Sequence, residues 1–76
     1  MSKRFPRITA PEAIKALEKV GFVLVRQSGS HKIFRNKDGQ RVTVPYHSGM
    51  DLHPMISKSV LKDVDLTLEE FKELMG

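Results

Sequence analysis

The chain contains no cysteine among its 76 residues. This absence excludes a disulfide scaffold, a zinc site built on thiolates and a cysteine nucleophile. Long apolar runs are also missing, since no stretch approaches the roughly 20 residues that span a bilayer. The opening residues 1–7 are basic but lead into no apolar segment. We therefore expect no secretory signal, no membrane partner and a cytoplasmic location.

Sequence motifs for metal, nucleotide and serine chemistry are absent as well. His31, His47 and His53 show no i,i+4 spacing on one helix and no paired cysteine, and Asp51 beside His53 makes only a weak cluster. No Walker-type loop and no G-x-S-x-G elbow occurs. We expect neither a metal nor a cofactor.

Chain length predicts one domain, residues 1–76, with residues 1–7 flexible. A chain this short buries only about 60% of its unfolded surface, which leaves no room for an enclosed cofactor pocket. A large substrate must therefore bind on the outside.

Charge is distributed unevenly along the chain. Residues 1–41 hold ten Lys and Arg against three Asp and Glu, whereas residues 42–76 hold three against six. This basic half suits contact with phosphates, although solvated basic residues on strand surfaces would give the same composition. Its central cations are Arg26, Lys32, Arg35, Lys37 and Arg41.

Periodicity and turn residues predict an α+β fold. A capping box from Thr9 to Glu12 opens a first helix that Gly21 closes, and a second from Thr67 to Glu70 opens a short last helix. Between them we expect a helix over about 54–62 and three strands that form an antiparallel meander, over 22–27, 31–35 and 41–44. Helices on one sheet face then make a two-layer sandwich, with Leu24 among its buried apolar residues.

The turn before the second strand carries the most distinctive chemistry. Ser28-Gly29-Ser30 is a flexible turn of small residues that leaves backbone amides free, and His31 follows it directly. Histidine gives or takes a proton near neutral pH because its unperturbed pKa is about 6.5. Phosphodiester cleavage needs both free backbone amides and a group that transfers protons. A strand-start histidine bonded to a backbone carbonyl is the structural alternative.

Together with its surroundings this turn resembles the HicA family, small toxins of toxin–antitoxin pairs that act as messenger-RNA interferases. The resemblance covers most of the chain: residues 14–22, residues 23–27, Gly29-Ser30-His31 with Phe34, and residues 41–45 followed by His47. It implies a double-stranded-RNA-binding-like fold with a short extra C-terminal helix, and His31 as the catalytic residue. It also implies a HicB-like antitoxin as partner and messenger RNA as substrate.

RNA cleavage by such a site needs no metal, because the 2′-hydroxyl of the RNA is the nucleophile. His31 would move the proton, and the amides of Ser28, Gly29 and Ser30 with Lys32 or Arg35 would hold the phosphorane charge. His47 is either a second proton-transfer group or structural, and Tyr46 either stacks on a base or caps the core.

The chain departs from the family at the second long helix. Many relatives have Gly-Thr-Leu where this chain has Met55-Ile56-Ser57, so we expect looser contact with the RNA backbone there. His53, just before this helix, has no predicted function.

Two functions of different class fit the sequence. The first is a metal-independent endoribonuclease, the toxin of a type II pair, that uses His31. The alternative is a non-catalytic RNA-binding module of the same fold. A DNA-binding domain is a weaker third reading, because no helix-turn-helix order occurs.

Overall fold

Three antiparallel strands in the order β1-β2-β3 form the sheet of this protein. The computed structural model describes residues 6–46 and 51–75. Along the chain the elements are α1 (Ala10–Lys19), β1 (Val23–Ser28), β2 (His31–Arg35), β3 (Arg41–Pro45), α2 (Pro54–Val64) and α3 (Leu68–Met75). This order confirms the predicted α+β architecture and the double-stranded-RNA-binding-like fold.

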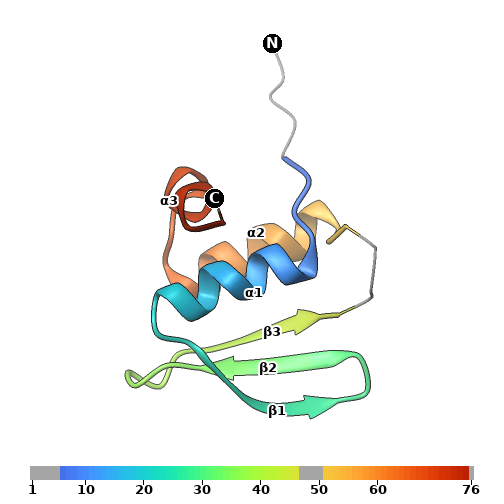
Figure 1. Cartoon of the computed structure of the whole chain (residues 1–76), viewed down its shortest axis with the longest axis vertical. Helices are drawn as coiled ribbons and strands as arrows, with labels where there is room; N and C mark the ends of the chain where they lie inside the picture. Colours follow the sequence, from blue (N-terminus) through green and yellow to red (C-terminus); the bar gives the residue numbers. More distant parts are fainter. Residues whose placement is uncertain (1–5, 47–50, 76) are drawn as a thin grey trace.

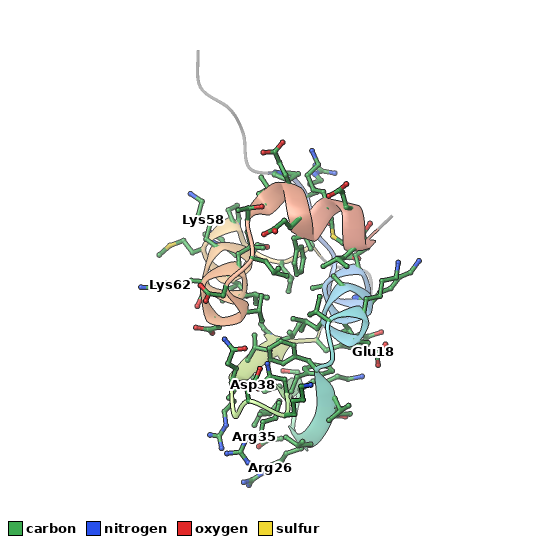
Figure 2. All side chains as sticks on the ribbon, turned by 90° about the vertical axis from the view of Figure 1, so that its left-hand side faces the viewer. Glu18, Arg26, Arg35, Asp38, Lys58 and Lys62 are labelled. Carbon is green, nitrogen blue, oxygen red and sulfur yellow. The ribbon has the colours of Figure 1, made fainter. Side chains whose placement is uncertain are left out.

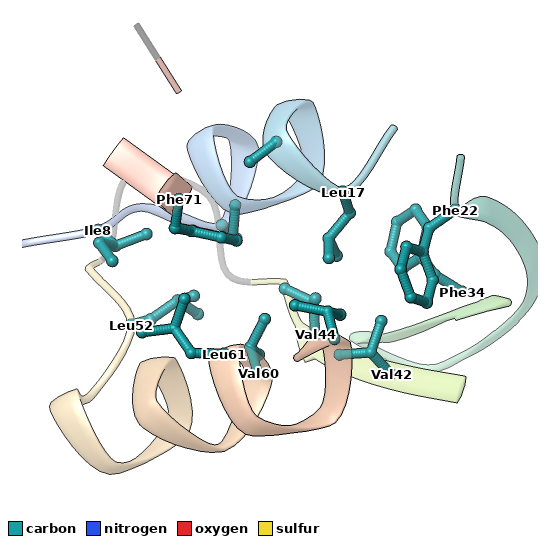
Figure 3. Packing of buried hydrophobic residues seen from close by; sticks show 14 residues of the cluster. Ile8, Leu17, Phe22, Phe34, Val42, Val44, Leu52, Val60, Leu61 and Phe71 are labelled. Carbon is teal, nitrogen blue, oxygen red and sulfur yellow. The ribbon is translucent and has the colours of Figure 1, made fainter. Parts of the chain in front are cut away.

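The helices α1, α2 and α3 lie on one side of the sheet, and no described element covers the other side (Figure 1). Phe34 and Val42 stand opposite each other on β2 and β3, and both side chains are buried. They face Leu17 of α1 and Val60 of α2 in a single apolar core (Figure 3). Alanine side chains at positions 10, 13 and 16 of α1 are also buried. Small side chains let a helix approach its neighbours closely, so α1 lies tightly within this core.

Helix α3 packs on the helix layer at the side away from the sheet (Figure 2). Its anchor is Phe71, which is 1% exposed and lies between α1 and α2 near Ile8 and Leu61 (Figure 3). The predicted capping box is present, because Thr67 Oγ1 accepts from the Glu70 amide and Glu70 Oε1 accepts from the Thr67 amide. The short extra C-terminal helix therefore closes the far end of the core.

Helix α1 begins and ends as the sequence predicts. Thr9 and Glu12 exchange the two hydrogen bonds of a capping box. At the other end Gly21 has φ 94°, and the amides of Gly21 and Phe22 bond back to Glu18 and Leu17. These two bonds define a Schellman motif, which requires a left-handed residue at the position of Gly21.

Four predicted boundaries, on three elements, were wrong by one or two residues. β1 runs over 23–28 rather than 22–27, because the Phe22 amide bonds back to Leu17 in the turn that ends α1. β3 includes Pro45, which stands opposite His31 at the sheet edge, where a missing N–H is tolerated. α2 continues to Val64 and ends at Asp65, which has φ 62° and repeats the pattern of hydrogen bonds seen at Gly21.

The prediction that Leu24 is buried was wrong. Leu24 is 46% exposed, and every residue of β1 is exposed. The helices pack mainly against β3, so β1 extends beyond their cover. A β-bulge between Leu24 and Arg26 further breaks the alternation of this strand.

Candidate nucleic-acid interface

Strand register defines which side chains share the uncovered side of the sheet. Residues directly opposite each other on neighbouring strands point to the same side. Because Phe34 faces the helices, His31, Ile33 and Arg35 of β2 face away from them. With their cross-strand partners they form a surface that we call the open face: Val23, Arg26, Ser28, His31, Ile33, Arg35, Arg41, Thr43 and Pro45.

The open face is basic, and none of its nine residues is acidic. Arg35 stands directly opposite Arg41, and Arg26 stands opposite Ile33 in the middle of the sheet. All three arginines are exposed, and Figure 2 shows Arg26 and Arg35 on the side away from the helices. Like charges directly opposite each other disfavour a bare sheet, so this arrangement suits a bound anion.

Sequence reasoning counted Arg26 and Arg41 among the basic residues of the chain but not among the site residues. The sequence does contain a signal for them. Side chains alternate along a strand, so Ile33 and Arg35 lie on the same side of the sheet as His31, and Arg26 and Arg41 are the cross-strand partners of these two residues. To identify these partners one must know the strand register, and the register across the turn at residues 36–39 is what brings Arg41 opposite Arg35.

The turn beside His31 is short, and two hydrogen bonds to its carbonyl groups stabilise it. Gly29 has φ 59° and Ser30 has no positive φ, which matches a two-residue type II′ hairpin. Gln27 Nε2 donates to the carbonyl of Gly29 at 3.2 Å, and the Tyr46 amide donates to the carbonyl of Ser30 at 2.6 Å. Within the described residues, no hydrogen bond uses the amides of Gly29 or Ser30 as donors. Both N–H groups are therefore available to an anion next to His31.

His31 is exposed at the start of β2, on the open face opposite Ser28. No hydrogen bond or ion pair engages its imidazole within residues 6–46 and 51–75. Among these described residues, no backbone carbonyl holds this ring, as the structural alternative would require. Within the described part of the chain, both ring nitrogens therefore lack a hydrogen-bond partner.

Lys32 points to the opposite side of the sheet from His31 and Arg35. It stands beside Val44 on the helix side, and its Nζ lies 4.2 Å from the centre of the Tyr46 ring. This cation–π contact occupies one face of the ring, while Tyr46 also packs against the core. The structure thus separates Lys32 and Tyr46 from the open face, although all of them lie near the same end of the sheet.

The start of α2 is held by its own residues. His53 Nδ1 accepts from the Met55 amide at 3.1 Å, so this histidine acts as the helix N-cap. Met55 is 73% exposed, whereas Ser57 is buried and its hydroxyl has no hydrogen-bond partner within the described residues. Looser contact between this helix start and the RNA backbone stays a prediction.

Three further points concern His47, metal-binding groups and membrane spans. His47 lies outside the described residues. Within residues 6–46 and 51–75, no group of three or more His, Cys, Asp and Glu side chains is arranged to hold a metal ion. In the same residues, no helix is long and apolar enough to cross a membrane.

A helix, a three-stranded antiparallel sheet and a second helix define a double-stranded-RNA-binding-like α+β domain, with an exposed histidine and arginines on its open face. Residues 10–66 match the family model described as the HicA toxin of bacterial toxin–antitoxin systems. The match covers more than half of the chain, so this protein belongs to the HicA toxin family. The match ends at residue 66, before α3 begins at Leu68. No curated protein matches the chain.

Proposed function

We propose that this protein is the toxin of a type II toxin–antitoxin pair and cleaves messenger RNA in the cytoplasm without a metal ion. The observation that carries the proposal is the position of His31, which is exposed on the basic open face beside two unbonded backbone amides. Family membership supports the toxin role. The catalytic role of His31 is our inference.

The reaction transfers the phosphate from the 5′-oxygen of one nucleotide to the neighbouring 2′-oxygen. His31 takes the proton from the 2′-hydroxyl, the 2′-oxygen attacks phosphorus, and the bond to the 5′-oxygen breaks. The leaving oxygen receives a proton from an acid, for which His47 or water is the candidate. A positioned histidine contributes about 10²- to 10⁴-fold to such a step.

Backbone amides and arginines stabilise the negative charge that develops on the phosphate. Free N–H groups at Gly29 and Ser30 adjoin His31 and supply neutral donors. The nearest cation of the open face is Arg26, whose partner Ile33 lies two residues from His31. Such preorganised donors contribute about as much as the proton transfer itself.

RNA binding is proposed to use the open face and the turn. Phosphates would contact Arg26, Arg35 and Arg41, which stand on the same side of the sheet as His31. Ser28, Gly29 and Ser30 would contact the scissile nucleotide. Contacts from Lys32, Tyr46 and His47 remain predictions, and those of Lys32 and Tyr46 need RNA to reach the helix side of the sheet end.

The proposed partner is a HicB-like antitoxin that covers the open face. Family membership supports an antitoxin partner, and the charge of this face supports an acidic one. We infer that it presents carboxylates to Arg26 and Arg35 on this face, and that a carboxylate for Lys32 has to reach the helix side of the sheet end. Complementary charge of this kind accelerates association and suppresses wrong partners.

One observation favours the alternative of a non-catalytic RNA-binding module. Within the described residues, no side chain orients the imidazole of His31 by a hydrogen bond. A general base is normally held by a third group, so an unheld histidine also fits simple contact with a phosphate or a 2′-hydroxyl.

The two functions are separated by incubating messenger RNA with wild type and with His31→Ala in excess EDTA. We expect wild type to cleave and to leave 2′,3′-cyclic phosphate ends, and the variant to bind RNA without cleaving it. Equal cleavage by both proteins would remove His31 from the mechanism. No cleavage by folded, antitoxin-free wild type would support the binding module.

A further inference from the structure

The edge strand β1 exposes more apolar side chain than any other element. Val23 is 59% exposed, Leu24 46% and Val25 52%, and they follow one another in sequence. The only further large apolar side chains exposed among the described residues are Val20, which ends α1, and Met55 of α2. Four of these five side chains therefore belong to β1 or to the segment that leads into it.

β1 also offers unpaired backbone groups. It pairs with β2 on one edge, and within the described residues no strand pairs with its other edge. In an antiparallel strand, alternate residues direct their N–H and C=O groups away from the neighbouring strand. Such an edge accepts an additional strand, unless charge, proline or irregularity prevents it.

The two sides of this edge differ in character. On the helix side, Leu24 stands opposite Phe34 beyond the cover of the helices. On the open face, Arg26 stands opposite Ile33, and Arg35 follows on the next strand. A strand laid beside β1 would therefore meet an apolar surface on one side and a positive surface on the other.

We propose that β1 accepts an extended, acidic segment of a protein partner as a fourth strand of the sheet. Alternate apolar side chains of this segment pack beside Leu24, and the intervening carboxylates face Arg26. Backbone hydrogen bonds to the outer edge of β1 provide attachment, and the alternation provides selection. The segment would border the open face on which His31 lies.

The charge of this protein favours an acidic partner on β1 over a second copy of the chain. The protein carries a net charge of +4, and no residue of β1 or of the open face is acidic. Pairing two copies through β1 would extend one sheet with two basic faces side by side, which repel each other. The bulge between Leu24 and Arg26 also makes the edge irregular, a feature that disfavours association of like edges.

The assignment of this partner as the antitoxin rests on the proposed function, whereas the strand-accepting edge does not. The two are therefore tested separately. RNA cleavage by wild type reports on the proposed function, and binding of a designed peptide in the absence of RNA reports on the edge.

The probe is a short peptide of alternating glutamate and valine, blocked at both ends, titrated into ¹⁵N-labelled protein. We expect chemical-shift changes centred on the amides of residues 23–28. Two control peptides isolate the causes. Lysine in place of glutamate reverses the charge, and N-methylation of alternate residues removes the hydrogen bonds along one edge. Both controls should bind at least about tenfold more weakly.

Variants of the protein give the matched test. Leu24→Lys should weaken binding of the glutamate peptide by about tenfold or more. It removes the apolar contact, and a charged side chain on an edge strand disfavours pairing with another strand. Met55→Lys makes the same kind of change on α2 and should leave affinity unchanged, with dispersed spectra showing that both variants fold. Arg26→Glu should bind the glutamate peptide more weakly than wild type does, and it should bind the lysine peptide more tightly.

Three results would overturn the proposal. The first is no binding of the glutamate peptide at residues 23–28. The second is equal binding of the N-methylated peptide, which would mean that charge alone attracts it. The third is concentration-dependent shifts of the same amides without peptide, abolished by Leu24→Lys, which would identify a second copy as the occupant.

Discussion

Neighbouring residues of β2 point to opposite sides of the sheet. His31 and Arg35 face the open side, whereas Lys32 faces the helix side and lies over the Tyr46 ring. The dipeptide His31-Lys32 therefore divides its two side chains between different environments. A pattern of basic residues in the sequence does not show this division, since it depends on which side of the strand the core occupies.

Removing two arginines of the open face should weaken RNA binding for every sequence. In Arg35→Ala/Arg41→Ala, each lost phosphate contact with single-stranded RNA removes about 0.7 from the slope of log affinity against log salt. Filter binding or fluorescence anisotropy across a salt series measures this slope. Lys62→Ala, on α2, removes a cation from the helix layer and should leave the slope unchanged. An unchanged slope in the double arginine variant would show that RNA does not bind the open face.

Two leucines should differ in their contribution to stability. Leu17 is fully buried in the core, so Leu17→Ala should cost about 2–5 kcal/mol of unfolding free energy. Leu24 is half exposed on the edge strand, so Leu24→Ala should cost less than about 1 kcal/mol. Urea denaturation followed by circular dichroism compares the two. Equal losses would mean that β1 is covered in solution.

At the scale of elements, helix ends depend on left-handed residues. Gly21 has φ 94° and Asp65 has φ 62°, and both close Schellman motifs. No atom lies within 4 Å of a Cβ built on Gly21, so the cost of a side chain there is conformational.

We therefore expect opposite effects from two substitutions at these ends. Gly21→Ala should destabilise the protein by about 1–2 kcal/mol, and Asp65→Gly should stabilise it by about 0.5 kcal/mol. Thermal unfolding of both variants checks the pair. Stabilisation by Gly21→Ala would contradict the assigned backbone conformation.

The starts of α1 and α3 were predictable from the sequence, because a capping box is a local pattern. Thr9 with Glu12 and Thr67 with Glu70 form the expected bonds. The end of α2 was not predictable, since Asp65 adopts a conformation for which glycine is the usual signal. The sides of β1 were not predictable either. The apolar run from Phe22 to Val25, which leads into β1, does not alternate with polar residues, and a bulge interrupts the strand.

At the scale of the whole molecule, charges separate between two ends. The open face holds three arginines and no acid, whereas Glu69, Glu70 and Glu73 lie on α3 at the far side of the helix layer. The charge imbalance along the sequence predicted a basic surface. It did not predict where α3 lies, because a short amphipathic helix does not specify the surface on which it packs.

This separation of charge predicts salt-sensitive binding of the antitoxin. Association with the proposed HicB-like antitoxin should be fast at low salt and slow markedly as salt rises, because positive potential on the open face steers an acidic partner. Stopped-flow or surface-based kinetics measure the association rate. Arg26→Ala/Arg35→Ala should lower it and flatten its salt dependence. A pull-down that recovers no complex at low salt would refute the proposed partner.

The central claim is that His31 performs the chemistry while the arginines of the open face hold the RNA. Single-turnover cleavage of messenger RNA, with antitoxin-free protein in excess and EDTA present, separates these roles. We predict that His31→Ala lowers the rate at saturating protein by about 10²- to 10⁴-fold without weakening RNA binding. Arg35→Ala/Arg41→Ala should need more protein to saturate but approach the wild-type rate. Cleavage by His31→Ala at the wild-type saturating rate would contradict the account.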